Sequence, residues 1–303
     1  LETLSRGKPL SFLDAHLRCG NSLLSAPLQD AAGKFTVEHI AAIPNEALSL
    51  VSDEPPVGVA EGAKRLLQQN RAFLKKRAAE KGKGLTRVLF GLDEGVLRST
   101  LESYLASRAE LERENGDLFR RREEKERLFQ RAWSAPEAPA RKLREVCDLW
   151  CSAWFWPEEE GVQAFGNPEY REALGRLLHD KPVEAPWYET ARRVAAEQRF
   201  FHWELEFPEV FLRDRPGFDA VGGNPPWEKL SGDLGELASE FDGLIKSMRG
   251  SEREARIAGI LSEPEHGRSI RRAARLRLQV GRFCRDGPPY EGLIQGEVNA
   301  RLP

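Results

Sequence analysis

The tetrapeptide Asn224-Pro225-Pro226-Trp227 combines residue types that could hold an amino-bearing heterocycle. The Asn224 side-chain oxygen and the Pro225 carbonyl can both accept hydrogen bonds from one exocyclic amine. Trp227 supplies a ring face on which a planar base can stack. The two prolines fix their own φ angles and have no N–H donors, so the loop backbone is stiff and presents acceptors only. The tetrapeptide therefore predicts a binding site for an amino group on a planar ring. The alternative is an ordinary turn.

Two predicted strands would position this tetrapeptide. Residues 218–223 form a short apolar run that ends in two glycines, which indicates a buried strand. In open α/β sheets, ligands bind outside the carboxyl ends of the strands, which is where the tetrapeptide follows. Upstream, residues 201–207 alternate large apolar side chains with His202, Glu204 and Glu206, a pattern typical of a half-buried strand. We expect these three polar residues on its solvent side rather than at a metal.

The tetrapeptide resembles motif IV of the amino-methyltransferases, (Asn/Asp/Ser)-Pro-Pro-aromatic, and Asn in first place resembles the adenine-N6 enzymes. Three further stretches resemble large adenine DNA methyltransferases of the type IIG restriction–modification kind. Residues 200–211 (FFHWELEFPEVF) resemble the segment before motif IV, residues 9–24 the motif III region, and residues 146–156 a piece of the central insertion. The chain is therefore identified as resembling an internal fragment of such an enzyme.

This resemblance implies an α/β fold, a partial class I S-adenosylmethionine-dependent methyltransferase (Rossmann-like) core interrupted by a large, mostly α-helical insertion. Residues 1–28 would belong to the core with the motif III region, and residues 29–196 would be the helical insertion. Residues 197–303 would complete the core with motif IV and a following helical segment.

The implied reaction is methyl transfer from S-adenosyl-L-methionine to adenine N6 in double-stranded DNA, after the adenine has been flipped out of the duplex. Asn224 and Pro225 would hold the two N–H bonds of the amine so that its lone pair faces the methyl group, with Pro226 stiffening the loop. Trp227 would stack on the flipped base, and neither a metal nor a covalent intermediate is required. Cysteine usage points to a cytoplasmic protein, because the four cysteines show no disulfide framework, which suits a reducing cytosol: Cys19, Cys147, Cys151 and Cys284.

The family resemblance places Gly20 and Asn21 near the adenine moiety of the cofactor, whereas the residues alone are equally compatible with a simple Gly-Asn-Ser turn. The glycine-rich loop that holds the rest of the cofactor in this family has no counterpart before residue 9. We therefore expect an incomplete chain, lacking amino- and carboxyl-terminal parts of its parent protein, that binds S-adenosylmethionine weakly or not at all by itself.

Helical spacing dominates the middle and the end of the chain. Apolar residues predict helices near 59–79 and over about 97–131. Seven arginines lie between residues 268 and 285 with almost no acid among them, which suits contacts with DNA phosphates or a solvated helix face. If they contact DNA, we expect the phosphates to be bound by Arg268, Arg271, Arg272 and Arg275.

The charge, the apolar runs and the cysteines of the chain argue against some classes of function. With 303 residues and a net charge of −2, the chain has no global nucleic-acid signature. The longest apolar run, residues 149–155, is too short to span a membrane. Cys147 and Cys151 lie one helical turn apart, but no second pair completes a zinc site, so we expect both to be buried.

Two other functions compete with adenine-N6 methylation of DNA. One is methylation of another amine, such as an RNA base or a protein glutamine. The other is a non-catalytic DNA-binding remnant.

Overall fold

The computed structural model describes residues 17–51, 58–82, 91–113, 138–158, 161, 163–223 and 232–288. Of these residues 66% are helical and 2% make β-type contacts, which are isolated bridges that form no sheet. The predicted α/β, Rossmann-like core is therefore wrong for the part of the chain that the structure describes.

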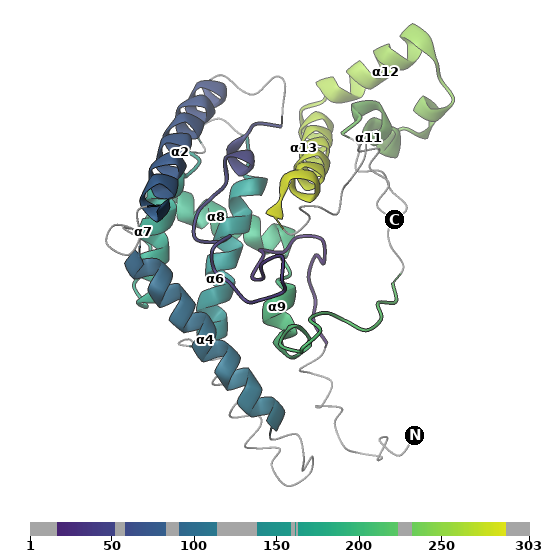
Figure 1. Ribbon diagram of the computed structural model, residues 1–303. Coiled ribbons are helices and arrows are strands. Elements are labelled where there is room, and N and C mark those ends of the chain that lie inside the picture. Colours follow the sequence, from purple (N-terminus) through teal and green to yellow (C-terminus); the bar gives the residue numbers. More distant parts are fainter. Residues whose placement is uncertain are drawn as a thin grey trace, which may run out of the picture. The chain divides into compact units, whose positions relative to one another are not determined.

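The chain divides into two compact units that alternate along the sequence, and Figure 1 labels their main helices. The first unit comprises residues 1–42, 76–152 and 168–221. The second comprises residues 43–75, 153–167 and 222–303. The long helix α2 (Val59–Gly82) contributes residues to both.

Helix α6 is the centre of the first unit and packs against α4, α8 and α9. Its buried side chains Leu143, Val146, Cys147 and Trp150 recur at the three- and four-residue spacing of one helix face. The Trp150 indole donates a hydrogen bond to the Ala42 carbonyl at 3.0 Å, which satisfies its only donor in this apolar setting. The helices of this unit are α4 (Gly91–Arg113), α6 (Pro139–Ser152), α7 (Asn167–Leu178), α8 (Pro186–Gln198), α9 (Trp203–Glu206) and α10 (Pro208–Phe211).

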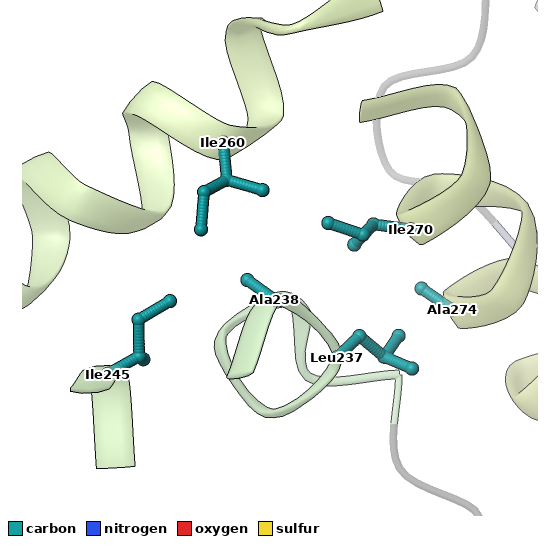
Figure 2. Packing of buried hydrophobic residues seen from close by; sticks show 6 residues of the cluster. All are labelled: Leu237, Ala238, Ile245, Ile260, Ile270 and Ala274. Carbon is teal, nitrogen blue, oxygen red and sulfur yellow. The ribbon is translucent and has the colours of Figure 1, made fainter. Parts of the chain in front are cut away.

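A cluster of aliphatic side chains holds part of the second unit together. Figure 2 shows these side chains pointing toward one another from α11, η5, α12 and α13. Asp233 and Asp242 cap α11 and η5 by accepting hydrogen bonds from the backbone N–H groups of Glu236 and Leu244. The cluster consists of Leu237, Ala238, Ile245, Ile260, Ile270 and Ala274. The elements are η1 (Asn45–Leu48), η4 (Ala153–Phe155), α11 (Leu234–Phe241), η5 (Gly243–Lys246), α12 (Gly250–Ser262) and α13 (Pro264–Asp286).

The helix predictions agree with the structure where it describes them. Helix α2 confirms the helix expected near 59–79, and α4 confirms the first part of the helix expected over 97–131. Residues 114–131 of that helix lie outside the described residues. Within the described ranges, no helix combines the length and the apolar character that a membrane crossing requires.

Both strand predictions are wrong. Residues 218–223 are irregular and exposed, and 82% of the Val221 side chain faces solvent. Residues 203–206 form the short helix α9, and His202 is only 1% exposed instead of lying on a solvent side. The alternating pattern at 201–207 does not produce a half-buried strand. Its polar residues form contacts with other segments and are covered together with their apolar neighbours.

Candidate functional site

The predicted catalytic residues Asn224, Pro225, Pro226 and Trp227 lie outside the described residues. The described site is instead the surroundings of residues 200–211, the segment that precedes them. This segment contacts residues 18–28 and the helices α4 and α6 within the first unit.

Gly20 and Asn21, the predicted cofactor residues, lie directly beside the start of this segment. Asn21 forms an isolated parallel bridge with Phe200, and its backbone N–H donates to the Arg199 carbonyl at 2.7 Å. The Asn21 side-chain oxygen accepts from Leu23 N at 3.2 Å, which is the local turn that the sequence also allowed. A Cβ atom on Gly20 would lie 2.8 Å from the Phe201 ring, so only glycine permits this close approach.

The Phe201 backbone continues the pairing by donating to the Leu24 carbonyl at 2.9 Å. The Trp203 indole then donates to the Ser22 carbonyl, also at 2.9 Å. Residues 20–24 and 199–203 are thus tied together by main-chain and side-chain hydrogen bonds across about 180 positions of sequence.

Ion pairs anchor the other end of the segment. Glu206 lies 3.0 Å from Arg18 and 2.8 Å from Arg144, and its side chain is only 9% exposed. Arg108 of α4, which is 3% exposed, pairs with Glu209 at 2.6 Å. Burial lowers the pKa of Arg18, and the nearby Glu206 carboxylate opposes that shift. The Glu206 and Glu209 carboxylates therefore supply the negative charges that offset the burial of these guanidinium groups.

His202 has a defined role in this packing. Its Nδ1 accepts a hydrogen bond from the backbone N–H of Ala26 at 3.1 Å, so the neutral ring carries its proton on Nε2. Nε2 then donates to Asp148 Oδ1 of α6 at 3.0 Å. No group of three or more metal-ligand side chains occurs among the described residues, and His202 acts as a packing residue that joins two segments.

The Glu204 carboxyl is only weakly hydrogen-bonded. Its Oε1 accepts from Leu28 N at 3.4 Å, whereas its buried Oε2 has no hydrogen-bond partner among the described residues. Burial raises the pKa of this carboxyl above its ordinary value of 4.5, because desolvation disfavours the charged form.

Glu204 is therefore expected to make stability depend on pH. The raised pKa contributes stability that is fully present below pH 4.5 and is lost as pH rises through the folded-state pKa. We expect Glu204→Gln to gain in thermal stability relative to the wild type as pH rises from about 4 to 7, because the amide stays neutral. Melting temperatures at several pH values test this, with the exposed Glu184→Gln as control. A difference that is flat or shrinks with pH would contradict it.

A groove between α6 and α8 in the first unit has a volume of about 650 Å³. Its floor contains Leu149, Ala191 and Tyr188, all of which are buried. The charged residues of its walls are Arg141, Arg144, Glu145, Asp148, Arg192 and Arg199. Sequence reasoning missed this groove because the two helices contribute arginines from positions about 50 residues apart, and their packing is not readable from spacing.

The predicted DNA-contacting arginines all lie on α13, in the second unit. Arg268, Arg271 and Arg272 are exposed on its first half. Arg275 is largely covered and lies 3.8 Å from the buried Glu158. Further along the helix, the buried Arg282 donates to the Trp154 and Ser49 carbonyls, so it is a packing residue.

Cys147 and Cys151 are buried on α6, as predicted. Burial raises the pKa of both thiols, which disfavours the reactive thiolate.

Comparisons with protein-family models, curated proteins and solved structures found no match to this chain.

Proposed function

We propose that this chain is part of a site-specific adenine-N6 DNA methyltransferase that transfers a methyl group from S-adenosyl-L-methionine to a flipped adenine. The observation that carries the proposal is the pairing between residues 20–24 and 199–203. These belong to two of the stretches in which the sequence resembles that family, one in the motif III region and one just before motif IV. They lie about 180 positions apart in the sequence, yet they form an isolated parallel bridge and share hydrogen bonds.

The proposal rests on this pairing and on the tetrapeptide at 224–227, and not on a Rossmann-like fold. Asn21, proposed for the cofactor side, lies beside Phe200, and the buried ion pairs of Glu206 and Glu209 fix the segment that follows. Twelve residues, 212–223, separate this segment from Asn224 in the sequence.

The chemistry assigned to the chain's own residues is positional. Asn224 Oδ1 and the Pro225 carbonyl accept the two amine hydrogens, which draws the lone pair of the amine out of conjugation with the ring. Stacking of Trp227 on the base contributes about 1–3 kcal/mol. We assign phosphate contacts to Arg268, Arg271 and Arg272, which are exposed to solvent.

A methyl-transfer assay tests the proposal. Label from S-adenosylmethionine is measured on unmethylated duplex DNA, with the full-length protein that carries this sequence and its Asn224→Ala variant. We expect label on adenine N6 in the wild type and a loss of at least about 100-fold in the variant, because one of the two amine acceptors is removed. Label on an RNA base or a protein glutamine instead of DNA would redirect the proposal to another amine.

The second candidate is a non-catalytic DNA-binding protein, and the exposed arginines at positions 268, 271 and 272 favour it. The same assay separates the two candidates. A folded protein that binds DNA but transfers no label to any acceptor would support the DNA-binding protein and exclude the methyltransferase.

A further inference from the structure

The groove between α6 and α8 has the charge and the shape of a ligand site. Four guanidinium groups and two carboxylates line it, and one of the four, Arg144, is already paired with Glu206 at 2.8 Å, which leaves an excess of one positive charge. Each helix contributes two of the arginines, Arg141 and Arg144 from α6 and Arg192 with the adjoining Arg199 from α8. An anion in the groove would therefore meet guanidinium groups from both walls.

The two carboxylates of the groove are already engaged by the protein. Glu145 accepts the hydroxyl hydrogen of Tyr188, and Asp148 accepts from His202. Since each acid already has a hydrogen-bond partner in the protein, neither needs a cation in the groove to satisfy it. This arrangement favours an anionic ligand over a cationic one.

The floor of the groove adds an apolar surface. Leu149, Tyr188 and Ala191 are buried beneath it, and Phe200 borders it. A volume of about 650 Å³ falls in the range of small-molecule sites, roughly 300–1,000 Å³, so the space fits a body larger than a bare inorganic ion. Arginine forks match the oxygens of a phosphate group, and the exposed Arg141 and Arg192 supply one fork from each helix.

We propose that this groove binds a small organic phosphate. The phosphate groups lie between the arginines of α6 and α8, and the apolar or planar part of the ligand lies on the floor. Binding at this groove does not depend on methyl transfer. Two of its residues also contact the segment that precedes the tetrapeptide, Arg144 through Glu206 and Asp148 through His202, and a third, Phe200, is the first residue of that segment. A bound ligand therefore stabilises that segment.

Calorimetric titration of the purified chain tests the proposal, with ADP and pyrophosphate as probes and adenosine as the uncharged comparison. We expect ADP to bind, pyrophosphate to bind more weakly, and adenosine to bind least. Arg141→Gln and Arg192→Gln should each weaken ADP binding about tenfold, because each removes one charge-assisted contact from an exposed side chain. Arg193→Gln is the matched control, because Arg193 is exposed on the same helix and does not line the groove.

Several results would overturn the proposal. These are no binding of ADP or pyrophosphate, equal weakening by the Arg193 variant, or adenosine binding as tightly as ADP. Binding of single-stranded DNA without binding of any small phosphate would assign the groove to nucleic acid instead. A second measurement maps the site: ADP should protect Arg141 and Arg192, but not Arg193, from modification by phenylglyoxal, and uniform protection would contradict the assignment.

Discussion

Glu206→Ala is expected to destabilise the first unit by about 3 kcal/mol or more. Glu206 pairs with both Arg18 and Arg144, and its side chain is 9% exposed. Removing the carboxylate leaves the buried Arg18 guanidinium without the charge that opposes its desolvation, and Arg108 and Arg144 repel it further. Breaking a buried pair by deleting one partner costs much more than the net contribution of the pair, because the other charge stays buried.

Urea unfolding followed by tryptophan fluorescence measures the change in the free energy of unfolding. Glu189→Ala is the control, because Glu189 makes a 3.8 Å pair with Arg192 in which both side chains are more than half exposed. Such surface pairs contribute about 0–1 kcal/mol. Glu206→Gln keeps the side-chain shape and loses only the charge, so it should fall between the two. A Glu206→Ala effect no larger than that of the control would show that the ion cluster does not anchor the segment.

The ion pairs of Glu206 illustrate why some parts of the fold could be predicted from the sequence and others could not. Helices α2 and α4 follow from local spacing: Leu97 and Leu101 repeat at four residues, and both are buried. The segment at 201–207 also has a clear local pattern, yet that pattern predicts the wrong element. A period of two does not reveal that His202 and Glu206 meet Asp148, Arg18 and Arg144 and are buried with their neighbours.

The candidate site shows the same limit. The resemblance selected the stretches around Asn21 and Phe200 separately, and their contact is visible only once the chain is folded. The arginines of the α6–α8 groove gave no signal, because each pair looks like an ordinary solvated helix face. On α13 the sequence signal was stronger than the structure supports. The run of arginines predicts one basic surface, but Arg275 pairs with Glu158 and Arg282 donates to backbone carbonyls.

Phe283→Ala is expected to have the largest effect in the second unit, a loss of about 3–5 kcal/mol in the free energy of unfolding. The Phe283 side chain is fully buried. Its ring meets Trp154 edge-on at 5.3 Å between centroids and Phe155 at 5.6 Å, so the variant loses apolar contact area and two aromatic pairs and leaves a cavity.

The neighbouring Arg282 makes this cavity costly to refill. Its guanidinium donates to the Trp154 carbonyl at 2.9 Å and lies 6.0 Å from the Trp154 ring, so Trp154 cannot shift toward the space without weakening these contacts. Phe283→Leu should therefore recover part of the loss by filling volume, and Leu278→Ala on the same helix, where 42% of the side chain is exposed, should cost less than about 1 kcal/mol. Chemical unfolding of the three variants decides the matter. Equal losses for Phe283→Ala and Leu278→Ala would mean that α13 is held by its ion pairs and not by the packing of Phe283 on η4.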